Sequence, residues 1–190
     1  MAASPLRLLI ESEPTATHEA RTGMRILLML TAGRTGRPRR SLGLGQVVEP
    51  FYVLQDAGAE VVVVSILGGY PLFRGSRSRS ARAIAALERF RGDHWARETI
   101  SDTLTYAQIF PEDFDGGVCI GALEGRLGSE DAGGALSLVT ALLAAGKPAA
   151  VVPGDLFDPQ PAAPKGLLIA GDQARSPFLA ARAVLAALDR

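Results

Sequence analysis

The chain has 190 residues, 47% of them hydrophobic, and its 20 basic and 20 acidic side chains cancel to a formal net charge of zero at pH 7. This length and composition predict one domain with a sizeable core. Zero net charge gives no electrostatic field that would attract nucleic acid or an anionic membrane surface. The sequence also contains no uninterrupted run of about 18 apolar residues, which is the length needed to span a bilayer. We therefore expect neither nucleic acid nor membrane as a partner, and a small, near-neutral molecule is favoured.

Continuous apolar runs and helical periodicity place the elements along the chain. Strands are predicted at 24–30, 60–65, 117–120, 149–152 and 167–170. Helices are predicted at 44–57, 80–90, 129–145 and 176–189. Continuous rather than alternating apolar strands suit a parallel sheet that is buried on both faces. The pattern predicts an α/β fold, a doubly wound parallel sheet with helices on both faces, whose ligands bind beyond the carboxyl ends of the strands.

The first 23 residues are predicted to be a disordered extension, so that the domain spans 24–190 and opens at Met24. The alternative is an arm that packs on a partner subunit. The extension lacks the basic start and small-residue cleavage pattern of a secretion signal. The single cysteine, Cys119, cannot form an internal disulfide and suits a reducing compartment. We expect a cytoplasmic location.

Five segments in the same order carry a resemblance to a known family. They are 24–30, 46–54 (QVVEPFYVL), 56–69 (DAGAEVVVVSILGG), 113–121 (DFDGGVCIG) and 146–155 (GKPAAVVPGD), and 168–173 (LIAGDQ) then precedes the last helix. Together they resemble the ThiJ/PfpI family, a branch of the class I glutamine amidotransferase-like superfamily. The resemblance implies a flavodoxin-like fold, a homodimer, and a nucleophilic cysteine on a turn after the strand at 149–152.

The residues at the expected nucleophile turn depart from that family. Its strand runs into Cys-His-Gly, and here these positions are read as Pro153, Gly154 and Asp155. Pro153 has no thiol and no backbone N–H, and its ring fixes φ near −65°. The family's glutamate, which tunes the acidity of the cysteine, is matched by Gln46, which cannot exchange a proton near neutral pH. We interpret Gln46, Pro153 and Gly154 as vestiges of an active site.

The third strand end and the connection after the turn are also altered. The family's Pro-Gly-Gly is kept only as Ile120-Gly121-Ala122, where Gly121 could offer its N–H to a ligand or could simply allow a tight turn. The connection at 156–165 is short and contains three prolines. The wall of the expected pocket is therefore predicted to be missing or rebuilt.

Cys119 is interpreted mainly as an inert core residue, with a relocated redox or nucleophilic thiol as the alternative. The carboxylates of Asp115, Glu124 and Asp155 could face it, but no histidine accompanies them. His18 lies in the extension, and His94 lies in what is predicted to be a surface connection. Neither a Cys-His dyad nor a metal site is expected.

The leading hypothesis is a non-catalytic ThiJ/PfpI-like domain that acts as a small-molecule-binding or protein-interaction module and needs no cofactor. Its candidate ligand-binding residues are Gly121, Ala122, Asp155 and Cys119. The alternative is a ThiJ/PfpI-type enzyme of the glyoxalase, deglycase, amidase or peptidase-like class with displaced residues, or with a new carboxylate site around Asp155.

Overall fold

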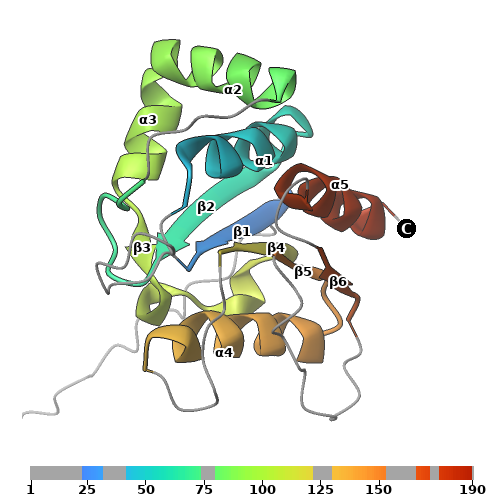
Figure 1. The fold of residues 1–190 in the computed structure, drawn as a ribbon. Helices are drawn as coiled ribbons and strands as arrows, with labels where there is room; N and C mark the ends of the chain where they lie inside the picture. Colours follow the sequence, from blue (N-terminus) through green and yellow to red (C-terminus); the bar gives the residue numbers. More distant parts are fainter. Residues whose placement is uncertain are drawn as a thin grey trace, which may run out of the picture.

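The computed structural model describes residues 23–31, 42–73, 80–121, 130–152, 166–171 and 176–189. Its centre is one six-stranded parallel sheet in the order β3-β2-β1-β4-β5-β6 (Figure 1). The strands are β1 Arg25–Leu30, β2 Glu60–Ser65, β3 Leu104–Thr105, β4 Gly116–Ile120, β5 Ala149–Val152 and β6 Leu168–Ala170. The helices are α1 Leu44–Asp56, α2 Ala81–Gly92, α3 His94–Ser101, α4 Glu130–Ala144 and α5 Ser176–Leu188, with short 3₁₀ helices η1 Tyr106–Gln108 and η2 Pro111–Asp113.

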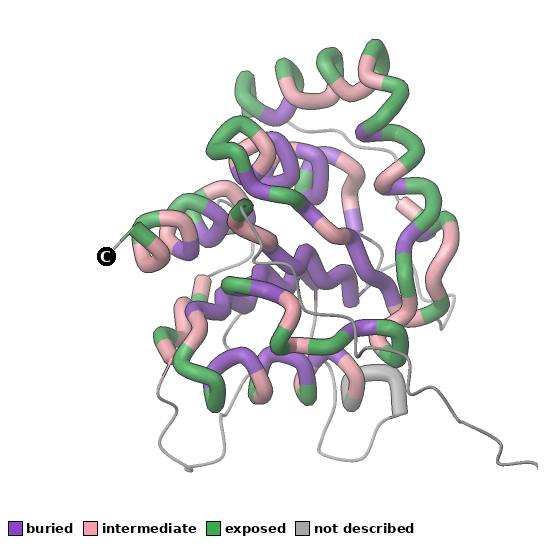
Figure 2. The backbone as a smooth tube through the Cα atoms, turned by 180° about the vertical axis from the view of Figure 1, so that it is seen from behind, coloured by how far each residue is buried: buried purple, intermediate pink, exposed green. Residues whose placement is uncertain are grey.

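The central strands are apolar along their whole length because helices cover both faces of the sheet. Ile26, Leu28 and Leu30 of β1 belong to the core under α1 and α5, whereas Leu27 and Met29 point to the core under α4. All five side chains are 0% exposed. Figure 2 shows the same arrangement as an almost unbroken buried stretch through the middle of the molecule. Successive residues of a strand alternate between faces, so a strand buried on both faces needs no polar position.

The strand order locates the point where the chain reverses its direction of travel across the sheet. From β1 the chain moves outward through β2 to β3, and it then returns to place β4 on the other side of β1. The carboxyl ends of β1 and β4 are therefore adjacent, which is where open α/β sheets bind ligands. The predicted doubly wound parallel sheet with helices on both faces is confirmed.

The helix α3 was not predicted from the sequence patterns. Residues 91–96, predicted as a surface connection, include the end of α2 and the start of α3. Asp93 caps α3, because its carboxylate accepts the N–H of Ala96 at 3.0 Å and the hydroxyl of Tyr52 at 3.0 Å. The cap explains why the chain starts a new helix there. Helix α2 packs on α1 instead of on the sheet, and Ala83 is its one buried residue (Figure 1).

Candidate functional site

The candidate site lies at the carboxyl ends of β1, β4 and β5, which we call the carboxyl edge. Leu30 pairs with Ile120 in the register of the sheet, and Ile120 pairs with Val152. Beyond β1, Thr31 donates its backbone N–H to the carbonyl of Ile120 at 3.0 Å, and its hydroxyl donates to the same oxygen at 3.2 Å. The strand ends are thus tied to one another by hydrogen bonds before the chain leaves the sheet.

Gly121 serves the turn at the end of β4. Its φ is +108°, a conformation that side chains rarely allow, and a Cβ placed there would lie 2.6 Å from the hydroxyl oxygen of Thr31. The N–H of Gly121 donates to the carbonyl of Val152 at 2.8 Å. This donor is therefore occupied, and the tight-turn interpretation of Gly121 fits the structure better than that of a free donor to a ligand.

The side chain of Gln46 caps the start of its own helix, α1. It is exposed in the first turn of α1, and its side-chain oxygen accepts the N–H of Gly43 at 3.0 Å. This reach back to the residue before the helix satisfies one of the free N–H groups of the first turn. The position that resembles the family's glutamate is thus a helix cap in this chain.

Glu49 is the partly buried carboxylate of α1, and its surroundings differ from those of Gln46. Partial burial raises the pKa of Glu49, while the positive charge of Arg82 on α2 lowers it. The guanidinium of Arg82 also lies 4.6 Å from the centre of the Phe178 ring on α5. Glu49 therefore faces the charged start of α2.

Cys119 is sealed inside the sheet. Its side chain is 0% exposed and belongs to the core under α4, between the neighbouring strand residues Met29 and Val151. Burial raises the pKa of the Cys119 thiol to about 12. Near neutral pH the sulfur is thus a protonated, inaccessible thiol, which favours the inert-packing interpretation over a relocated nucleophile.

Four of the predicted site residues, Ala122, Pro153, Gly154 and Asp155, lie outside the described residues, and so does Glu124. The described part of β5 ends at Val152, which is 2% exposed. If the glycine of the family's Cys-His-Gly triplet is matched with Gly154, the nucleophile position moves from Pro153 to Val152. Neither side chain carries a nucleophile, and the interpretation of this turn as a vestige of an active site stays a prediction.

Lys147, the middle residue of the Gly-Lys-Pro segment, has a structural role. Its ammonium group donates to the carbonyls of Pro111 and Glu112 at 3.0 Å each. It thereby joins the start of β5 to η2, at the end of the sheet opposite the carboxyl edge. In this chain the lysine of the Gly-Lys-Pro segment therefore stabilises the entry into β5.

Neither His94 nor its surroundings form a metal site in the part of the chain that the structure describes. His94 is exposed at the start of α3, with its Nδ1 atom 3.4 Å from the carboxylate of Glu98. The described residues contain no group of three or more His, Cys, Asp or Glu side chains that could hold a metal ion. Nor does any helix among them combine the length and the apolar character needed to cross a membrane.

Solved structures share this fold. Rapid Encystment Protein 24 kDa from Francisella tularensis matches with a TM-score of 0.62 and 11% identity over 87% of this chain and 99% of that chain. Glyoxalase III from Candida albicans matches with a TM-score of 0.62 and 14% identity, over 86% and 97% of the two chains. A ThiJ/PfpI domain protein from Brachyspira murdochii matches with a TM-score of 0.53 and 12% identity, over 87% and 95%.

Unlike the structure comparison, the sequence comparisons found no match: no protein-family model and no curated protein matches the chain. At identities of 11–14% the structural matches establish architecture and leave activity open. They agree with the resemblance carried by the five sequence segments. The chain has the flavodoxin-like fold of ThiJ/PfpI-type proteins.

Proposed function

We propose that this protein is a non-catalytic ThiJ/PfpI-like domain that binds a small molecule or a protein partner at its carboxyl edge. The observation that carries the proposal is the burial of Cys119, the only thiol of the chain, in the core under α4. Thiol catalysis needs an exposed thiolate beside oxyanion-stabilising donors. Cys119 does not meet the first requirement, because its raised pKa keeps it protonated and packed side chains enclose it.

Two further contacts support the same proposal. The side-chain oxygen of Gln46 is engaged by Gly43, and the N–H of Gly121 is engaged by Val152. The groups that would assist a nucleophile are thus used to stabilise a helix start and a turn. By resemblance to the family we also propose a homodimer in the cytoplasm, with Ala122 and Asp155 as ligand-binding candidates.

The alternative is an enzyme with a rebuilt site, and the fold that the chain shares with Candida albicans glyoxalase III gives a reaction to test. Methylglyoxal turnover should be measured with the purified protein and with Cys119→Ala. We expect no turnover above the protein-free rate for either. Turnover that is lost in a folded Cys119→Ala protein would establish a thiol enzyme and refute the proposal.

A carboxylate-based site is tested separately. Asp155→Asn is compared with Asp102→Asn, which alters an exposed aspartate of the loop after α3. Neither substitution should change methylglyoxal turnover if the protein is non-catalytic. Activity that depends on Asp155 alone would instead assign the chain to the rebuilt-enzyme class.

A further inference from the structure

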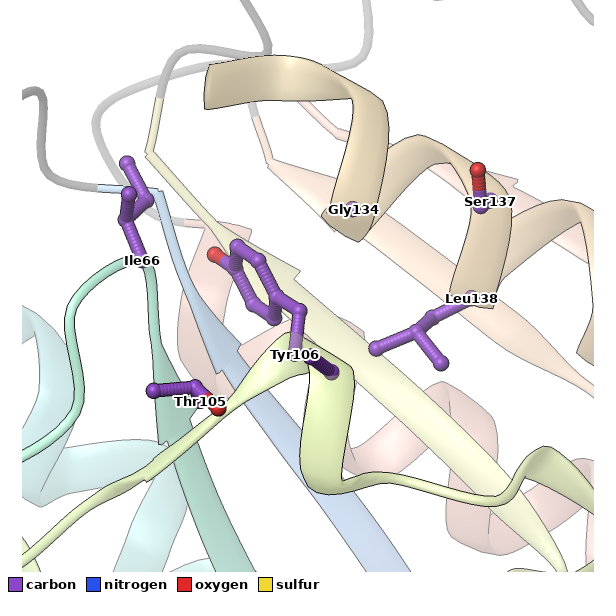
Figure 3. A pocket seen from close by; sticks show the side chains of 7 residues that line it. Ile66, Thr105, Tyr106, Gly134, Ser137 and Leu138 are labelled. Atoms are coloured by element: carbon purple, nitrogen blue, oxygen red, sulfur yellow. The ribbon is translucent and has the colours of Figure 1, made fainter. Parts of the chain in front are cut away.

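A pocket lies at the carboxyl ends of β2 and β3, between η1 and α4 (Figure 3). Its volume is about 340 Å³, which is at the lower end of the range for small-molecule sites. The lining comes from Ile66 after β2, from residues 105–107, and from Gly134, Ser137 and Leu138 of α4. It shares no residue with the carboxyl-edge positions Gln46, Gly121 and Val152.

The floor of the pocket is the ring of Tyr106, which is held from two sides. Its hydroxyl donates to the carbonyl of Leu30 at 2.7 Å, which anchors the ring to the end of β1. On the other side the ring packs against Gly134, where a Cβ would lie 2.7 Å from the Tyr106 Cδ2 atom. A glycine at that position therefore lets the ring approach α4 closely, and the pocket is formed in advance of any ligand.

The chemistry of the lining restricts what could bind. None of the described lining residues is charged, and Ile66, Leu138 and the Tyr106 ring provide an apolar surface. The polar groups are hydroxyls: that of Thr105 lies 2.9 Å from the Gln108 side-chain oxygen, whereas Ser137 is exposed on α4 at the rim. An ion would lose its hydration there without gaining an opposite charge.

From this geometry we propose that the pocket between η1 and α4 binds a small, neutral, ring-containing molecule through the Tyr106 ring and Leu138. The volume admits a molecule of one or two fused rings, and the uncharged lining disfavours nucleotides, which carry phosphate groups. The lining shares no residue with Gln46, Gly121 or Val152, although the Tyr106 hydroxyl reaches Leu30 at the end of β1, so different variants test the two proposals.

The test uses indole as a neutral bicyclic probe and indole-2-carboxylate as its charged analogue, titrated into the ¹⁵N-labelled full chain. Indole should give saturable shifts at residues 105–107 and 134–138, with a dissociation constant on the order of 1 mM for so small a ligand. Indole-2-carboxylate should bind at least tenfold more weakly. Shifts that are absent or spread over the surface would overturn the proposal, as would equal binding of the two probes.

Filling the pocket separates this site from unspecific binding. Ala107 is exposed and lines the pocket, so Ala107→Trp should occupy the space and abolish the indole shifts at 134–138. Ala144→Trp, at the exposed far end of α4, is the matched control and should keep them. Ser137→Trp, also in the lining, is a second filling variant that should likewise abolish the indole shifts. Retention of wild-type binding by a folded Ala107→Trp protein would refute the site.

Discussion

The hydroxyl of Tyr106 donates a hydrogen bond of 2.7 Å to the backbone carbonyl of Leu30, 76 residues earlier in the chain. Leu30 is the last residue of the central strand, and its neighbour in the register is Ile120 at the end of β4. Burial raises the pKa of Tyr106 well above its ordinary value, with a further contribution from nearby Cys119. One phenol therefore connects the pocket between η1 and α4 with the core of the sheet.

Removal of that hydroxyl should be measurable as a loss of stability. Tyr106→Phe should lower the free energy of unfolding by about 1 kcal/mol, because a mostly buried hydrogen bond is lost while the ring stays. Tyr70→Phe is the control, since Tyr70 is 64% exposed and should tolerate the change. Urea unfolding of the three proteins compares them. Equal stability of all three would show that the Leu30 contact contributes nothing.

The thiol of Cys119 should resist modification while the protein is folded. We expect 5,5′-dithiobis(2-nitrobenzoate) to react with less than a tenth of the thiol in the time that suffices in urea, because the side chain is 0% exposed. Release of the coloured thiolate at 412 nm follows the reaction. Native-state reactivity as fast as in urea would contradict the burial of Cys119.

The same residue should make stability depend on pH in the alkaline range. The folded-state pKa of Cys119 is about 12, above the value of 9.0 for a free thiol. The unfolded chain therefore releases this proton first, so the contribution is complete below about pH 9 and is lost as pH rises toward 12. Cys119→Ala should show a shallower decline in stability between pH 8.5 and about 10 than wild type. Parallel curves for the two proteins would be the contrary result.

Sequence patterns predicted the parts of the fold that rest on continuous burial. β1 and β5 could be recognised because both of their faces are apolar, and α4 ends at Ala144, two residues before Gly146, whose φ is +82°. β3 could not be recognised, because it has two residues at the sheet edge and Leu104 is 40% exposed. The helix α3 has one local sequence signal, the capping residue Asp93.

The location of the candidate site could be predicted from the sequence, but the contacts within it could not. Parallel strand ends and the absence of cysteine after β5 can be read along the chain. The hydrogen bond from the Gly121 N–H to the Val152 carbonyl joins residues that are distant in sequence, so no local sequence pattern predicts it. The same holds for the depth of Cys119, which depends on α4 covering that face of β4.

Gly121 offers a direct test of the turn at the carboxyl edge. Gly121→Ala should destabilise the protein by about 1–3 kcal/mol, because the new Cβ would meet Thr31 and the φ of +108° disfavours any side chain. Gly92→Ala is the control, since nothing lies within 4 Å of its added Cβ. Thermal or urea unfolding measures both. A Gly121→Ala protein as stable as Gly92→Ala would show that the turn relaxes freely.

The final prediction concerns Gln46 and separates a helix cap from a catalytic remnant. Gln46→Ala should lower the free energy of unfolding by about 0.5–1 kcal/mol, because the N–H of Gly43 loses its acceptor. Gln46→Glu should be as stable as wild type or slightly more stable, since a glutamate at this position also accepts that bond and its charge suits the start of a helix.

Glu88→Ala, at an exposed position within α2, controls for the helix propensity of alanine. The cap is contradicted if Gln46→Ala matches this control in urea unfolding. Gln46→Glu should also leave methylglyoxal turnover at the protein-free rate, because residue 46 is exposed and Cys119 is enclosed in the core. Turnover that appears with this one substitution would mean that a nucleophile is within reach of α1, and the non-catalytic proposal would fall.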